Sequence, residues 1–441
     1  MRRRLTNLFA VLLISLPSLP RAENLMDIYG LALQNDPITK EAEAKQSAAG
    51  ESRDQGLARF FPTLAATGGS SRNWFNTRKL NFQGTDQEYW NNNFSLNLSQ
   101  PLFHWDHWIQ LSQSDNQIAQ AEAAYQSELQ NLIVRTTEAY FNVLSAQDNL
   151  QFTVSEKQAI SKQLEQAKER FEVGIIPITD VYEAQAAFDA TTANELEAAN
   201  NLDNKKEALR EIIGENEGLI SPLGETLPLK KPEPDNMSKW GETAEFNNLS
   251  IVASFNQMEV SRKAIDIQRN GHLPTLDLVG SYGVSDNSAS FGPRGDTQSI
   301  GVQLNVPLFE GGAVNSRTRQ ASFEYEAAKE NLTAIKRSVK RQVNNTYRSI
   351  LTNISRIEAL KATVTSAESA LEAAEAGFEV GIRTMVDVLA EQRYVYRAKR
   401  DLSRTRYDYL VNTIKLKQTT SDLNQNDLEQ INGLLVTNPA K

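Results

Sequence analysis

Few residues of this chain have both the type and the spacing that catalysis or metal binding requires. The sequence has no cysteine, three histidines, and no GxSxG, HExxH or phosphate-loop motif. His104 and His107 are three positions apart, with Asp106 between them, at the expected start of a helix. Two histidines and one aspartate without another clustered ligand are weak grounds for a metal site. We therefore predict no enzyme, no metal and no cofactor, and keep a metal at these histidines as the alternative.

A second group of polar residues follows two copies of one short segment. FEVGIIPITDV begins at Phe171 and FEVGIRTMVDV begins at Phe378, 207 positions later, and seven of the eleven residues are the same. Gly174 and Gly381 can adopt the left-handed conformation that ends a helix. Side chains that could cap a new helix come next: Thr179, Asp180, Thr384 and Asp387. Each segment is therefore predicted to be a helix–turn–helix reversal, called a tip below.

The similarity extends over both halves of the chain. Three further matches keep the same order: Tyr140 with Tyr347, PLF at 101–103 with 307–309, and PTL at 62–64 with 274–276. We interpret the chain as an internal duplication, in which each half has a helix, two strands, a very long helix, a tip and a return helix. The predicted parts are a signal peptide (1–22), a first repeat (23–214), an equatorial linker (215–249), a second repeat (250–418) and a C-terminal segment (419–441).

Two kinds of helix are predicted in each half. The opening helix covers about 28–58, and its counterpart covers about 250–270. The long helices lie within 103–174 and 309–381, contain no proline, and would each measure roughly 100 Å at ~1.5 Å per residue. In the second long helix, apolar residues at steps of three and four form one stripe: Leu332, Ile335, Val339, Val343, Tyr347, Ile350, Ile354 and Ile357.

Four segments between the helices read as strands. The clearest, 94–99 and 300–306, alternate apolar and polar residues, as strands with lipid on one face and water on the other would. A half-covered sheet in a sandwich is the alternative. Four strands cannot close a barrel, and open edges leave unpaired backbone groups in hydrocarbon. Two copies would supply eight strands and three copies twelve, so we predict that the chain acts with identical neighbours.

Aromatic residues mark the ends of these strands. We interpret them as a belt at the membrane–water interface: Trp74, Trp90, Phe103, Trp105 and Trp108. The last three share a run with His104 and His107, which is why a metal site competes with the belt as an explanation of that run.

The N-terminus and the charge restrict location and partners. Residues 1–22 combine several arginines with an apolar run, which is typical of a secretory signal. The net charge is −9 for the whole chain and −13 without that segment. So acidic a chain repels nucleic acid, and no nucleic-acid partner is predicted.

A family resemblance is carried by the two tips and by three further segments: ENLMDIYGLA after the signal, GHLPTLDL at 271–278 and PLFEGGAVNS at 307–316. The chain resembles the TolC family, the outer-membrane channel proteins of Gram-negative bacteria. The resemblance implies an α+β membrane protein, a homotrimer with a 12-strand β-barrel (four strands per chain) in the outer membrane. The β-barrel would continue into the periplasm as a long coiled-coil α-helical barrel, with a mixed equatorial domain. A periplasmic adaptor protein and an inner-membrane pump of the RND, ABC or MFS type are the implied partners, in an exit duct for drugs or secreted proteins.

The resemblance also implies roles for tip residues, because the family closes its periplasmic end by polar contacts. The matching gate positions are Arg383, Asp387, Thr179, Asp180, Gln163 and Glu375. One guanidinium can bind an aspartate and a threonine hydroxyl together, so Arg383 could tie two helices. Phe378 replaces the family's tyrosine, which removes a hydrogen bond to Asp180, and Ala390 replaces a second acid. The implied adaptor surface is Val173, Gly174, Ile175, Val380, Gly381 and Ile382; helix capping and turn formation are the competing explanations.

Two other functions remain open at this point. An envelope enzyme lacks its motifs, as described above. A coiled-coil stalk or adhesin without a channel would explain the long helices, but it gives no purpose to four alternating strands inserted between them.

Overall fold

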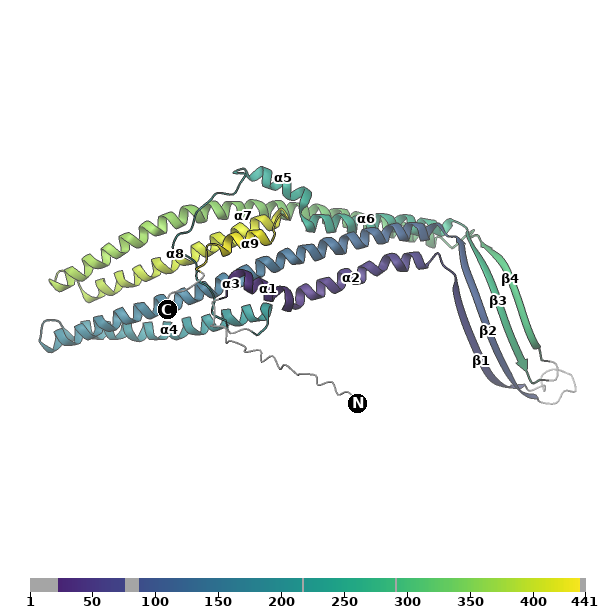
Figure 1. Ribbon diagram of the computed structural model, residues 1–441, viewed down its shortest axis with the longest axis horizontal. Helices are drawn as coiled ribbons and strands as arrows, with labels where there is room; N and C mark the ends of the chain where they lie inside the picture. Colours follow the sequence, from purple (N-terminus) through teal and green to yellow (C-terminus); the bar gives the residue numbers. More distant parts are fainter. Residues whose placement is uncertain (1–22, 76–86, 216–217, 290–291, 437–441) are drawn as a thin grey trace, which may run out of the picture. The chain divides into compact units, whose positions relative to one another are not determined.

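The computed structural model describes residues 23–75, 87–215, 218–289 and 292–436 (Figure 1). The predicted signal peptide and the last five residues lie outside this part of the chain. Two compact units are present, and both halves of the repeat contribute to each of them. The described residues of unit 1 fall within Met1–Pro37, Gln130–Met237 and Asn344–Lys441, and those of unit 2 within Ile38–Leu129 and Ser238–Val343.

The two long helices are confirmed as α3 (Trp105–Glu172, 68 residues) and α7 (Ala313–Glu379, 67 residues). The α7 helix begins later than the predicted range because Gly311 and Gly312 have φ angles of 62° and 83°, in the left-handed region. The apolar stripe of α7 is at least half-buried throughout its length. Among the described residues, we find no helix with the length and apolar content of a membrane span.

The opening helix is two helices, α1 (Leu25–Asn35) and α2 (Pro37–Ala58), so the prediction of one continuous helix was wrong. The break falls at Asp36, whose backbone is extended (φ −61°, ψ 118°), because a following proline disfavours helical geometry. In unit 1 the Asp36 carboxylate is almost fully buried and accepts two hydrogen bonds from Arg135, at 3.0 and 2.9 Å.

The second half has a corresponding break. Helices α5 (Met237–Asn247) and α6 (Leu249–Arg269) meet at Asn248, whose side chain accepts hydrogen bonds from the backbone N–H groups of Ser250 and Ile251. Since α5 lies inside 215–249, the segment predicted as a linker contains a helix of its own.

In unit 1 each long helix has a return partner, α4 (Ile178–Ile213) beside α3 and α8 (Met385–Thr419) beside α7 (Figure 1). Ion pairs link the partners: Lys157 to Glu195 and Lys399 to Glu368, both at 2.7 Å. A short helix, α9 (Gln425–Asn432), follows α8. Each half of the repeat thus supplies one long helical hairpin.

The sheet of unit 2 is a single antiparallel meander in the order β1-β2-β3-β4. Its strands are β1 (Thr63–Phe75), β2 (Gln87–Phe103), β3 (Thr275–Asn287) and β4 (Arg294–Asn305). The β2–β3 pairing joins the two halves of the repeat. Within the described chain, β1 and β4 each pair on one side, so the sheet has two open edges.

The strand register places apolar and polar side chains on opposite faces of the sheet. Leu98 faces both Leu64 and Gly280 across the sheet, and Gly280 faces Ile300, so apolar and small residues share one side. On the other side, hydroxyl pairs cross between strands: Thr67 with Ser95 and Ser281 with Ser299, each at 2.7 Å. The apolar face alternates with a polar one, as predicted for strands between lipid and water.

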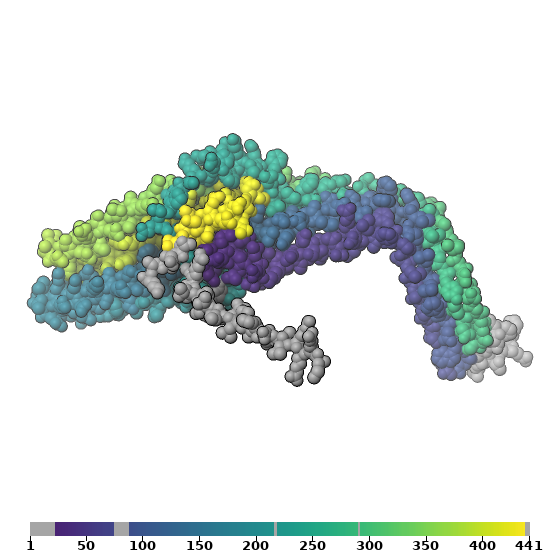
Figure 2. Space-filling model, viewed as in Figure 1, coloured from purple at the N-terminus to yellow at the C-terminus, as the bar shows by residue number. Residues whose placement is uncertain are grey.

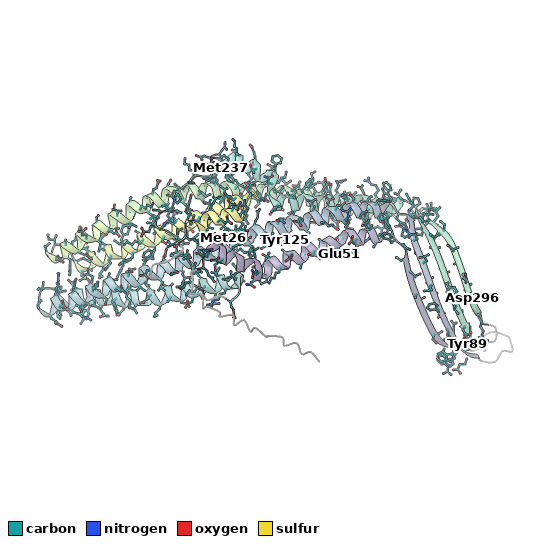
Figure 3. The ribbon with its side chains drawn as sticks, viewed as in Figure 1. Met26, Glu51, Tyr89, Tyr125, Met237 and Asp296 are labelled. Carbon is teal, nitrogen blue, oxygen red and sulfur yellow. The ribbon has the colours of Figure 1, made fainter. Side chains whose placement is uncertain are left out.

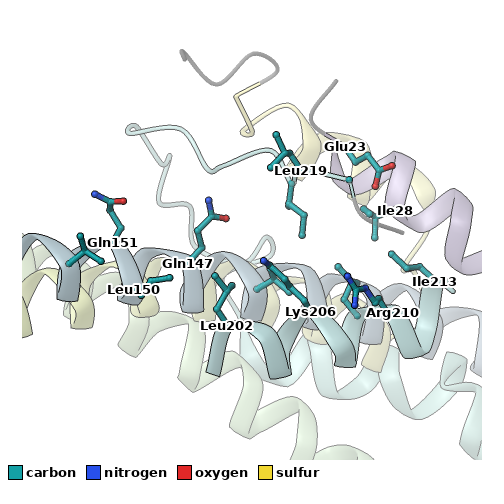
Figure 4. A pocket seen from close by; sticks show the side chains of 15 residues that line it. Glu23, Ile28, Gln147, Leu150, Gln151, Leu202, Lys206, Arg210, Ile213 and Leu219 are labelled. Atoms are coloured by element: carbon teal, nitrogen blue, oxygen red, sulfur yellow. The ribbon is translucent and has the colours of Figure 1, made fainter. Parts of the chain in front are cut away.

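Three distant segments of the chain are tied together in unit 1. Glu23 pairs with Ile220 in a parallel bridge, and Leu223 pairs with Leu435 in an antiparallel bridge. A cavity of about 500 Å³ lies beside these segments, between α3, α4 and the start of the chain (Figure 4). Apolar side chains line it together with three charged ones, those of Glu23, Lys206 and Arg210. The described residues of the linker are therefore part of the packed fold.

Candidate functional site

The two tips fold into the same turn. After α3, the Ile175 N–H donates to the Arg170 carbonyl and the Gly174 N–H to the Phe171 carbonyl, both at 2.9 Å. The same two bonds recur 207 positions later, at 2.8 and 3.1 Å. This pattern is a Schellman motif, and the φ angles of 76° at Gly174 and 78° at Gly381 lie in the left-handed region that it requires. The predicted helix reversals are confirmed.

The helices that follow the two turns begin differently. At α8, the Asp387 N–H donates to Thr384 Oγ1 (3.2 Å) and the Thr384 N–H donates to Asp387 Oδ2 (2.9 Å), which forms a capping box. At α4 the N-cap is Pro177, which has no side-chain donor or acceptor, and Thr179 and Asp180 lie in the first helical turn. Capping is therefore confirmed for the second tip and wrong for the first, where the helix starts directly after the proline.

A hydrophobic core joins the two hairpins behind the turns. Its buried residues come from all four helices of the two hairpins: Ile160, Leu164, Ala167, Val181, Ala184, Ala187, Ala374, Phe378, Met385, Val388 and Leu389. The Arg170 guanidinium lies 5.1 Å from the centroid of the Phe378 ring, a favourable cation–π arrangement. Phe378 is thus a buried packing residue of the tip.

One polar pair implied by the resemblance is in contact. Gln163 Nε2 lies 3.4 Å from Glu375 Oε1, so the pair links α3 to α7. Burial raises the pKa of the Glu375 carboxyl above its ordinary value, and the neighbouring carboxylates of Glu379 and Glu372 add to the rise. The link therefore joins an amide to a carboxylate that is less well solvated than usual.

Arg383 lies on the other side of the second turn and is exposed. Its side chain packs on Gly377, where an added Cβ would lie 2.7 Å from Arg383 Cγ. Within the described part of a single chain, Arg383 makes no hydrogen bond to the exposed Thr179 or the half-buried Asp180. The implied gate contact is thus not made inside one copy.

The carboxylate of Asp387, at the second tip, is held by hydrogen bonds from Thr384 and lies near the charge of Arg383. Hydrogen bonds from the Thr384 backbone and side chain lower the pKa of its carboxyl, and the charge of Arg383 lowers it further. The carboxylate is half-buried and remains charged at neutral pH. Such a group can serve as a helix cap and as a fixed negative charge together.

The turns themselves present apolar side chains to the surface. Val173, Ile175, Val380 and Ile382 are 69 to 81% exposed, two on each tip. An added Cβ at Gly174 or Gly381 would have no neighbour within 4 Å. The tips are visible in Figure 2 at the ends of the hairpins, in blue for the first and yellow-green for the second. Four exposed aliphatic residues at two equivalent turns form a duplicated apolar surface.

The predicted interface aromatics fall into two groups in unit 2. Trp74 and Trp90 share one end of the β1–β2 hairpin, and the Arg72 guanidinium lies 5.7 Å from the ring centroid of each. Tyr89, at this same end of the sheet, is labelled in Figure 3. The other group is Phe103, Trp105 and Trp108, at the end of β2 and the start of α3. All five predicted aromatics are 45 to 72% exposed.

Sequence reasoning missed two residues beside the tips, one in each half of the chain. Arg170 was not expected to stack on a ring that lies 208 positions away. Gly377 offered a signal, because a glycine inside a long helix costs stability and implies a close neighbour. The neighbour is the Arg383 stem.

A sheet with one apolar face, joined to long helical hairpins with duplicated tips, is the architecture of an outer-membrane channel protein. The sequence profile of the outer membrane efflux protein family matches residues 28–215 and 240–421, and the chain belongs to this family. The protein is accordingly an outer-membrane channel protein and not an enzyme.

Proteins of similar sequence align with this chain over nearly its whole length. Outer membrane protein TolC of Vibrio cholerae is 38% identical over 440 residues, which cover 98% of each chain. Its counterpart of Escherichia coli is 36% identical, over 99% of this chain and 90% of that protein. Alkaline protease secretion protein AprF of Pseudomonas aeruginosa is 30% identical, over 98% and 91%.

Solved structures support the fold. The CmeC outer membrane channel of Campylobacter jejuni has a TM-score of 0.79 and 16% identity, and the match covers 99% of this chain and 98% of that one. The outer membrane protein VceC of Vibrio cholerae has a TM-score of 0.74 and 19% identity, over 90% and 96%. The predicted fold class, with four strands per chain and long helices, is confirmed.

Proposed function

We propose that three copies of this chain form an exit duct through the outer membrane and the periplasm. The support comes from the sheet, whose apolar face and two open edges are incompatible with isolation in lipid. Three copies supply twelve strands, which close the edges and leave room for a lumen. The helical hairpins would form the periplasmic part of the duct.

The duct serves drug efflux and type I protein secretion in this proposal. Relatives of both kinds support it: a protease secretion protein is 30% identical over 98% of this chain, and an outer membrane efflux protein is 22% identical over 72%. The duct itself adds no chemistry to its cargo. A periplasmic adaptor and an inner-membrane pump of the RND, ABC or MFS type would choose and drive the cargo.

The periplasmic end is gated by polar contacts between copies. Arg383 is exposed, and in a single chain it makes no hydrogen bond to Thr179 or Asp180 among the described residues. Since a guanidinium can bind an aspartate and a threonine together, the Arg383 of one copy would hold the α4 start of its neighbour. The Gln163–Glu375 pair and the Phe378 core would keep each tip rigid.

The adaptor would dock on the duplicated apolar surface of the tips. Val173 and Ile175 of the first turn match Val380 and Ile382 of the second, and all four are exposed in the described part of the chain. An adaptor with matching apolar grooves could therefore engage both turns in the same way. Val173→Asp together with Val380→Asp should abolish adaptor crosslinking while trimers remain intact.

Two measurements on the mature protein in detergent test the duct. Mass measurement should give three copies per particle, and insertion into a planar lipid bilayer should give discrete, cation-selective conductance steps. A monomeric particle, or trimers that never conduct even after the Arg383→Ser change, would support a stalk or adhesin without a channel instead.

A further inference from the structure

A cluster of histidine and aspartate side chains lies where the sheet of unit 2 meets α3. His104 sits between β2 and α3, and its Nε2 lies 3.0 Å from Oδ1 of Asp277 on β3. His107, on the first turn of α3, stacks on it with ring centroids 4.5 Å apart and an interplanar angle of 15°. Two imidazoles and a carboxylate from distant parts of the chain are thus brought together.

The hydrogen bond to Asp277 defines which nitrogen of His104 is available. With its proton on Nε2 and donated to Asp277, His104 keeps the lone pair of Nδ1 free to bind a cation. Nδ1 lies 3.9 Å from Oδ1 of Asp106. A carboxylate that orients a histidine through its second nitrogen is the usual arrangement behind a metal-binding histidine.

His107 supplies an independent observation. Its Nδ1 is buried and has no hydrogen-bond partner within the described part of the chain. The Phe60 ring packs against the His107 imidazole in an edge-to-face arrangement, with ring centroids 5.8 Å apart, so this neighbour of the imidazole is apolar. Buried polar atoms in native proteins nearly always have a partner, so this unpartnered nitrogen of a residue in the cluster calls for one.

We propose that His104, Asp106 and His107 bind a divalent transition-metal ion of the zinc type, with Asp277 as a positioning residue. One ligand atom from each of the three lies within 4.8 Å of the others. Side-chain rotations that splay the two stacked rings would bring these atoms to the ~3.4 Å spacing of a tetrahedral ion with bonds of ~2.1 Å. A water molecule would complete the four ligands.

The donor types decide the class of ion. Two imidazole nitrogens and one carboxylate suit zinc, nickel, cobalt or copper, whereas calcium and magnesium prefer oxygen ligands throughout. Besides the two histidines, the charged groups that act on this site are the proposed ligand Asp106, the carboxylate of Asp277 and Arg59, so two carboxylates face one cation. The ion would fasten the start of α3 and, through Asp277, the neighbouring strand β3.

The sequence did not favour this site because it shows only three of the four residues together. Asp277 is 173 positions from His104 and belongs to the other half of the repeat. Its carboxylate reaches His104 because β3 pairs with β2 at this end of the sheet.

Metal binding by the full mature protein, produced without a histidine tag, tests the proposal. Equilibrium dialysis against Zn²⁺ should give one tightly bound ion per chain, and Co²⁺ should give the intense visible absorption of a tetrahedral site. His104→Ala and His107→Ala should each weaken binding about 100-fold or more. Asp277→Asn should weaken it by about 10- to 100-fold, as expected for a group behind a ligand. His272→Ala, which removes the chain's third histidine, is the matched control and should change nothing.

The shift of the thermal unfolding midpoint on adding Zn²⁺ gives a second readout. Each variant is compared with itself, so a difference in stability between variants does not affect the result. Zn²⁺ should raise the unfolding midpoint of the wild type and of His272→Ala, because an ion that binds the folded state stabilises it. It should leave that of His107→Ala unchanged. The proposal is overturned if the wild type binds no stoichiometric ion, if Co²⁺ remains octahedral, or if both histidine variants bind Zn²⁺ as tightly as the wild type.

Discussion

The side chain of Arg383 lies directly on the bare Cα of Gly377, so closely that a Cβ there would be 2.7 Å from Arg383 Cγ. The Arg383 N–H also donates to the Gly377 carbonyl, at 3.1 Å. These contacts fix the direction in which the arginine leaves the second tip. The proposed gate therefore depends on a glycine inside a helix as well as on the arginine itself.

Arg383→Ser should loosen the closed end of the trimer. The change removes the guanidinium that would bind Thr179 and Asp180 of the neighbouring copy, while serine remains compatible with the turn. We expect a higher single-channel conductance and a larger open fraction in planar bilayers. Arg393→Ser, on α8 beyond the tip, is the control. Equal conductance of the Arg383 variant and the wild type would exclude this arginine from the gate.

Gly377→Ala should have the same effect without removing a charge. The methyl group would collide with the near end of the Arg383 side chain, which cannot move aside without changing its direction. The control is Gly50→Ala on α2, where an added Cβ meets nothing within 4 Å, and it should be neutral or slightly stabilising. If Gly377→Ala conducts like the wild type, the closed state of the gate does not depend on the direction of the Arg383 side chain.

Asp387→Asn should reduce the preference of the channel for cations. Three copies would place three of these carboxylates around the narrow end, and a ring of negative charge attracts cations. The change also weakens a capping box, so a variant with the same helical role elsewhere is needed. Asp27→Asn alters the capping box of α1 and should cost similar stability with unchanged selectivity. Reversal potentials in a salt gradient measure the difference.

Glu375→Gln should stabilise the protein at neutral pH. Because the folded state raises the pKa of this carboxyl, the native protein binds a proton there more readily than the unfolded chain. The resulting contribution to stability is present below the ordinary value of 4.5 and is lost as the pH rises through the raised value. Glutamine keeps the link to Gln163 without a charge. The gain in thermal midpoint should therefore be larger at pH 8 than near pH 4.5.

Glu358→Gln is the matched control for this change, since Glu358 is an exposed residue of the same helix. Its midpoint should follow that of the wild type at each pH. A gain for Glu375→Gln that is the same at both pH values would show that the carboxyl does not titrate differently in the folded state.

Local patterns explain why much of the fold could be predicted. The positions of Gly174 and Gly381 determine where the long helices end, and the alternation of apolar and polar residues determines the strand faces. The helix break at Asp36 also has a local signal, because Pro37 follows it, although the predicted opening helix of about 28–58 runs through this position. Contacts between distant residues could not be predicted, since the register that brings Asp277 to His104 is a property of the assembled sheet.

The duplicated tyrosines lead to a last prediction. Tyr140 is fully buried and its hydroxyl donates to the Ser221 carbonyl at 2.7 Å, while the Tyr347 hydroxyl donates to an Asp235 carboxylate oxygen at 2.5 Å. Both acceptors lie in 215–249, so the equivalent tyrosines of the two halves hold the segment that joins them. Burial raises the pKa of Tyr140 and keeps its hydroxyl protonated as a donor.

Tyr140→Phe should lower the free energy of unfolding by about 1 kcal/mol, the usual contribution of one hydrogen bond. Tyr347→Phe should cost no more than this, because its acceptor Asp235 is exposed to water. Tyr182→Phe on α4, where the ring is 67% exposed, is the control and should be neutral. Protease cleavage inside 215–249 should become faster in the first two variants and stay unchanged in the third. If neither tyrosine variant is cleaved faster, the segment is held by its bridges to Glu23 and Leu435 alone.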